Sequence, residues 1–107
     1  MLDKKLLNFI SRESKRLIRF YGSNTDSRTR NLARLAKVTE ELGELSNEVL
    51  AIDGDQRSSK LSGNHREKAA EEIADVIITV LLLAEHLDLD AERALKQKIK
   101  KIKNRKY

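Results

Sequence analysis

The stretch EEIADVIITVLLLAEHL, residues 71–87, decides the fold. At 100° per residue, one face of this helix is made of Ile73, Val76, Ile77, Val80, Ala84 and Leu87. Ile78 and Leu82 lie on roughly the opposite side, so the helix is apolar on two sides. A helix of this kind is buried on two sides. We expect the other helices of the chain to cover one face and a second subunit to cover the face of Ile78 and Leu82.

Apolar residues recur at helical spacing in three further segments, so the whole chain is predicted to be helical. The four expected helices cover about 3–20, 28–52, 65–87 and 90–104. Residues 53–64, DGDQRSSKLSGN, are polar and predict a loop between the second and third helices. The sequence therefore predicts one all-α domain over residues 1–107, a four-helix bundle that assembles as a homodimer or a dimer of dimers.

Polar residues at the expected helix starts support these boundaries. Asp3 is a suitable N-cap for the first helix, and Asn64 followed by Glu67 resembles a capping box for the third. Asp88 or Asp90 is expected to cap the fourth helix. The lysine-rich end of that helix suits the negative pole of its dipole.

Composition limits the classes of protein that fit. The 107 residues include no Cys, which excludes disulfides and thiolate metal sites, and no Pro, which favours long helices. The apolar run at 73–84 is too short to span a bilayer, which needs about 20 residues. The first residues lack the apolar core of a signal peptide. We therefore expect a soluble, cytoplasmic protein without a membrane partner.

A row of carboxylates lies in the second helix, within KVTEELGELSNEVL at 37–50. Glu41, Glu44 and Glu48 share one side of this helix, whereas Glu40 points largely away. Like charges at these spacings repel, and the repulsion grows when water is removed. A positive group is therefore expected beside them.

The third helix offers a matching pair of acids, Glu72 and Asp75, at i,i+3 spacing. Asp75 lies inside an apolar run, where an unpaired charge is costly to bury. If the helices pack antiparallel, Glu41 and Glu44 face Glu72 and Asp75. Four carboxylates without His or Cys suit Mg²⁺, with Mn²⁺ as a substitute, better than Zn²⁺. The alternatives are a solvated acidic face and ion pairs with Lys or Arg.

The residues that carry these acids resemble a known family. Glu40-Glu41-Leu-Gly-Glu44, 27 intervening residues and Glu72-Ile-Ala-Asp75 are similar to the EExxE and ExxD signature of the MazG-like, all-α nucleoside triphosphate pyrophosphohydrolases. The similarity spans about residues 30–107. It implies hydrolysis of a nucleoside triphosphate to the monophosphate and pyrophosphate, with Mg²⁺ held by Glu41, Glu44, Glu72 and Asp75. Phosphoribosyl-ATP pyrophosphohydrolase belongs to the same superfamily and implies an alternative substrate.

No nucleophilic side chain is needed for this chemistry, because a water molecule attacks the phosphate. We expect Glu41 or Glu44 to orient that water as a base. Lys37, one turn before Glu41, is expected to form an ion pair or to contact phosphate.

The basic last helix completes the resemblance in part. Similar family members carry a Lys four residues before an Asn, which Lys100 and Asn104 match, so the resemblance implies that they bind phosphate. The Arg usually found three residues later is replaced by Tyr107, and we expect Arg105 or Lys106 to substitute.

One non-enzymatic alternative remains. A non-catalytic helical module could bind nucleic acid through the basic C-terminus, although stacking aromatic residues are few and the acidic cluster would repel a polyanion.

His65 and His86 stand alone in the sequence and are expected to be capping or surface residues.

Overall fold

The computed structural model describes residues 1–22, 24–52, 54 and 64–107, which form four α-helices and no strand. The helices are α1 (Lys4–Tyr21), α2 (Ser27–Ile52), α3 (His65–His86) and α4 (Ala91–Lys103). The predicted all-α class with four helices is confirmed. The predicted 53–64 loop lies outside the described residues except for Gly54 and Asn64. No described helix combines the length and apolar character needed to cross a bilayer.

Short polar side chains cap the helix starts. The side chain of Asp3 accepts a hydrogen bond from the Lys5 amide, and that of Asn64 accepts one from the Glu67 amide. These two caps were predicted from the sequence. Of the two candidates for α4, Asp90 is the N-cap and accepts a bond of 3.0 Å from the Arg93 amide.

Asp88 instead closes the C-terminal end of α3. Its backbone is left-handed, with φ of 55°. The Leu89 amide donates to the Ala84 carbonyl at 2.9 Å, and the Asp88 amide donates to the Glu85 carbonyl at 3.1 Å. These bonds form a Schellman motif in which Asp occupies the position usually taken by Gly. The motif ends α3 and sets the direction in which α4 begins.

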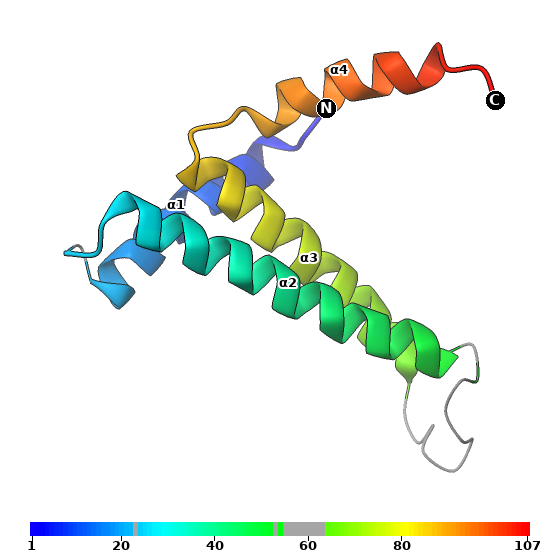
Figure 1. Ribbon diagram of the computed structural model, residues 1–107, viewed down its shortest axis with the longest axis horizontal. Helices are drawn as coiled ribbons and strands as arrows, with labels where there is room; N and C mark the ends of the chain where they lie inside the picture. Colours follow the sequence, from blue (N-terminus) through cyan, green and yellow to red (C-terminus); the bar gives the residue numbers. More distant parts are fainter. Residues whose placement is uncertain (23, 53, 55–63) are drawn as a thin grey trace.

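The helices α2 and α3 run antiparallel side by side, and α1 packs against α3 (Figure 1). The core cluster consists of Ile10 from α1 with Leu81 and Leu82 from α3. Helix α4 runs away from the α2–α3 pair, and every residue from Arg93 to Tyr107 is exposed. The chain therefore forms a three-helix assembly from which the basic fourth helix extends.

The prediction that Ile78 and Leu82 face a second subunit is wrong. Leu82 is 4% exposed and belongs to the core, and Ile78 packs against that core, because α1 covers this face of α3. The other apolar face is the open one, with Ile73 and Ile77 48% and 50% exposed. Both faces are aliphatic, so the pattern alone did not determine which of them α1 would cover.

A second exposed apolar stripe runs along α2. It consists of Leu35, Leu42 and Val49, which repeat every seven residues and are 51%, 52% and 43% exposed. Because α2 and α3 are antiparallel, helical geometry places this stripe on the same side of the pair as Ile73, Ile77 and Val80. We call these six residues the α2–α3 apolar surface. It lies on the side of the pair away from α1.

Candidate metal site

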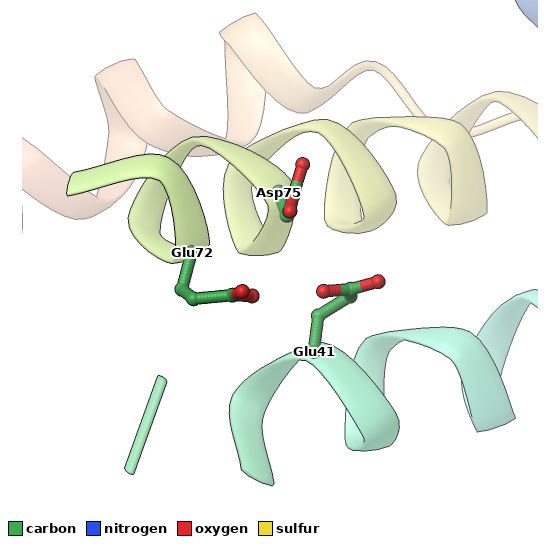
Figure 2. Close-up of side chains that lie close together, drawn as sticks. All are labelled: Glu41, Glu72 and Asp75. Carbon is green, nitrogen blue, oxygen red and sulfur yellow. The ribbon is translucent and has the colours of Figure 1, made fainter. Parts of the chain in front are cut away.

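Three carboxylates meet between α2 and α3. One oxygen from each of Glu41, Glu72 and Asp75 lies within 4.8 Å of the other two. Figure 2 shows Glu41 projecting from α2 toward Glu72 of α3, with Asp75 one turn further along α3. The i,i+3 spacing of Glu72 and Asp75 and the antiparallel packing produce this convergence, as the sequence suggested. The cluster has the donor set of a site that could hold a metal ion.

Two oxygen atoms of the cluster lack hydrogen-bond partners. Oε2 of Glu41 and Oε2 of Glu72 are buried and accept no hydrogen bond from any described residue. Glu41 as a whole is only 7% exposed. A buried carboxylate oxygen without a partner is costly, and a hard divalent cation would satisfy it. The residues present therefore fit a cation such as Mg²⁺.

One lysine partly neutralises the cluster. The ammonium of Lys37 lies 3.3 Å from Oε1 of Glu41 and 3.3 Å from Oε1 of Glu40. Hydrogen bonds to Glu41 and then to Glu40 raise the pKa of Lys37, so it stays charged. Glu40 is exposed and stands outside the three-carboxylate group, in keeping with its predicted orientation. A single ammonium leaves most of the negative charge of the cluster unbalanced.

The excess negative charge changes proton affinities. Burial raises the pKa of Glu72 to about 7, with further contributions from a hydrogen bond with Glu41 and the charges of Glu44 and Glu41. The charge of Glu41, more than any other cause, also raises the pKa of Glu44. Glu44 is exposed and lies outside the three-carboxylate group, but it is close enough to interact with both Glu41 and Glu72. Without a cation, Glu72 is therefore partly protonated near neutral pH.

The apolar run around Asp75 suggested that its carboxylate would be buried, and the structure shows otherwise. It is exposed, because it lies at the edge of the α2–α3 contact rather than at its centre. Its apolar neighbours Ile73, Val76 and Ile77 project to other sides of α3. Within one chain, Asp75 therefore does not need a buried basic partner.

The residues predicted to bind phosphate fall into two groups. Lys37 lies at the cluster. Lys100, Asn104 and Arg105 are exposed at the end of α4, which is not packed against α2, so a single chain does not bring them to the carboxylates.

Both histidines make specific contacts that the sequence analysis missed. Nδ1 of His65 lies 2.7 Å from Oε2 of Glu48, so the third acid of the α2 row is paired with the first residue of α3. Nδ1 of His86 lies 3.1 Å from the Leu82 carbonyl and 3.3 Å from the buried Ser14 hydroxyl. Both histidines are half-buried rather than surface residues. The partners of the two histidines are either distant in sequence or backbone groups, so no local sequence pattern predicted these contacts.

Comparison with known proteins agrees with the motif. Residues 35–107 match the model of the MazG-like family. The chain is 36% identical over 76 residues to the uncharacterized protein YpjD of Bacillus subtilis (strain 168). The aligned region covers 71% of this chain and 67% of that protein. No solved structure gives a significant match. The matched region contains all four predicted metal-binding acids, and the chain belongs to the MazG-like family.

Proposed function

We propose that this protein is a Mg²⁺-dependent nucleoside triphosphate pyrophosphohydrolase, which converts a nucleoside or deoxynucleoside triphosphate to its monophosphate and pyrophosphate. The observation that carries the proposal is the convergence of Glu41, Glu72 and Asp75, with two buried oxygen atoms that have no partner in the described chain. Membership of the MazG-like family supports the same reaction.

In this proposal Glu41, Glu72 and Asp75 hold the metal, with Glu44 as a fourth ligand or as the base. When bound, Mg²⁺ supplies Lewis-acid activation of the phosphate chain and offsets charge on the leaving pyrophosphate. Glu44 is the better candidate for the base because it is exposed beside the cluster and its pKa is raised, which strengthens its affinity for a proton. Lys37 orients Glu41 through their ion pair and can contact a phosphate oxygen.

We further infer that the protein assembles as a homodimer or a dimer of dimers. The α2–α3 apolar surface has six large aliphatic residues in contact with solvent, and exposed patches of this kind usually mark interfaces. Leu95, Ile99 and Ile102 form another exposed stripe on α4. In such an assembly, Lys100, Asn104 and Arg105 would serve phosphate binding if α4 of one copy reached the cluster of another.

The test is a panel of canonical and damaged nucleoside and deoxynucleoside triphosphates with Mg²⁺, scored for pyrophosphate and for orthophosphate. We expect pyrophosphate release from at least one member. Glu72→Gln and Asp75→Asn should each lower the rate by about 100-fold or more, since even outer partners of metal ligands contribute about 10- to 100-fold.

Glu71→Gln is the matched control, because Glu71 is exposed on the same helix and stands outside the cluster. It should retain near wild-type activity. Release of orthophosphate alone, or no release from a folded protein across the whole panel, would contradict the proposal. Equal loss in the control would show that general charge, not the cluster, matters.

A further inference from the structure

A cavity lies between the end of α1 and the start of α2, apart from the acidic cluster. It has a volume of about 490 Å³, within the usual range for small-molecule pockets. Its walls come from the last turns of α1, the first three turns of α2 and His86 of α3. Neither Lys37 nor any of the clustered acids lines it, so its ligand need not be the ligand of the candidate metal site.

Much of the cavity wall is apolar. Leu17 and Ile18 contribute to it from α1, and Ala33 and Ala36 contribute from α2. The two alanines are exposed, so this part of the wall is open to solvent. Helix α1 packs mainly against α3, which leaves room between α1 and α2. A ligand with an apolar body would bury this surface and bridge the two helices.

The charged side chains of the wall are guanidinium groups, and no described residue that lines the cavity is acidic. Arg30 donates to the Thr25 carbonyl and interacts with the charge of Asp26. Arg34, one turn further along α2, is half-buried and makes no ion pair or hydrogen bond with another described residue. Guanidinium groups suit bidentate recognition of carboxylate and phosphate. An anionic group is therefore the expected partner of Arg34.

The side chain of His86 forms a fixed part of the wall. Its Nδ1 lies 3.1 Å from the Leu82 carbonyl and 3.3 Å from the buried Ser14 hydroxyl. Because the carbonyl only accepts hydrogen bonds, Nδ1 is assigned the proton, and Nε2 of the neutral ring is an acceptor. These contacts hold the ring before a ligand binds, which lowers the cost of ordering the site. Recognition of negative charge therefore depends on Arg34 rather than on His86.

We propose that this cavity is a separate site for a small organic anion, in which Arg34 binds a carboxylate or phosphate group and the apolar wall receives the body of the ligand. The acidic cluster favours cations, so the two sites select different ligands. The inference does not rest on the proposed reaction, because it needs neither the clustered carboxylates nor a bound metal.

The experiment is isothermal titration calorimetry of the whole chain without divalent cations, so that phosphate cannot bind through a metal at the acidic cluster. The probes are phenyl phosphate, benzoate, benzyl alcohol and inorganic phosphate. Benzyl alcohol lacks the charge, and inorganic phosphate lacks the apolar body. We expect phenyl phosphate, benzoate or both to bind about tenfold or more tightly than the other two probes, as charge-assisted hydrogen bonds allow. Comparing phenyl phosphate with benzoate shows whether the site prefers phosphate or carboxylate.

Arg34→Gln should weaken binding of the preferred anion by about tenfold or more. Arg28→Gln is the matched control, because Arg28 is exposed on α2 and does not line the cavity. It should bind the anion as the wild type does. Ala33→Phe, which fills the cavity from an exposed position, should abolish binding. Circular dichroism should show the helices retained in every variant.

Anionic probes that bind no more tightly than benzyl alcohol would overturn the proposal. An affinity that survives Arg34→Gln or Ala33→Phe would do the same, because the anion would then bind elsewhere. Equal loss in Arg28→Gln would attribute binding to general charge and also refute the site. None of these outcomes depends on pyrophosphate release, so failure of this site and failure of the proposed reaction are distinguishable.

Discussion

Glu72 shows how one side chain links proton binding to metal binding. Burial, with interactions from Glu41 and Glu44, raises its pKa to about 7, so it is largely protonated in mildly acidic solution. Metal ligands must be deprotonated, so a cation and a proton compete for this group. The cluster should therefore bind Mg²⁺ more tightly as the pH rises through neutrality.

The effect on stability has a definite sign. An acid whose folded pKa is raised stabilises the fold below its unfolded pKa, here 4.5, and this contribution is lost as the pH rises through about 7. In EDTA, we expect the melting temperature of the wild type to decrease between pH 5 and pH 8. Glu72→Gln should reduce that decrease. Calorimetric scans at several pH values measure it.

The same scans with Mg²⁺ give the complementary result. The metal-induced rise in melting temperature should be larger at pH 8 than at pH 5, and it should be small in Glu72→Gln. Glu71→Gln, with the same charge change outside the cluster, should behave as the wild type does. A pH dependence unchanged in Glu72→Gln would show that this group does not titrate as described.

Among the elements, α3 is central to both the packing and the candidate site. It contacts both α1 and α2 and supplies two of the three clustered acids. The apolar periodicity of α3 and its Asn64 cap allowed the helix and its approximate ends to be predicted from the sequence. The i,i+3 acids likewise indicated which residues would converge. The sequence did not predict which apolar face of α3 is covered by α1. Ile78 on the covered face and Ile77 on the exposed face are chemically alike, and only the path of α1 distinguishes them. The pairing of His65 with Glu48 was not predicted, because the two residues are 17 positions apart and lie on different helices.

The packing of α3 on α1 gives a prediction about the core. Leu82→Ala should lower the free energy of unfolding by about 2–5 kcal/mol, as is typical when a buried leucine is truncated. Leu32→Ala, at a residue 52% exposed on α2 and outside the α2–α3 apolar surface, should change it by no more than about 0.5 kcal/mol. Urea denaturation measures both. Equal losses would mean that Leu82 does not lie in the core described above.

At the scale of the whole molecule, large aliphatic residues are exposed on α2, α3 and α4. The described residues leave the α2–α3 apolar surface and the α4 stripe uncovered. The acidic cluster lies outside the α2–α3 apolar surface, so a partner bound to that surface need not block access to the carboxylates. Assembly and metal binding can therefore be tested separately.

Ile77→Lys should convert the assembly to monomers, because it places a charge in the middle of the α2–α3 apolar surface. Light scattering at micromolar concentration measures the mass, and circular dichroism should show the helices retained. Glu71→Lys, which changes the charge more but lies away from that surface, should keep the oligomer. A wild type that is already monomeric would rule out the proposed assembly.

The left-handed Asp88 also makes the course of α4 adjustable. Asp88 sets the bend between α3 and α4, together with Glu92, which binds the Met1 ammonium and the Leu2 amide, and it lies away from the acidic cluster. Asp88→Gly should preserve the bend and gain about 1 kcal/mol of stability, since glycine adopts this conformation without steric cost. Asp88→Val should instead strain the bend and redirect the arm, which spin labels on α3 and α4 would register as a changed separation.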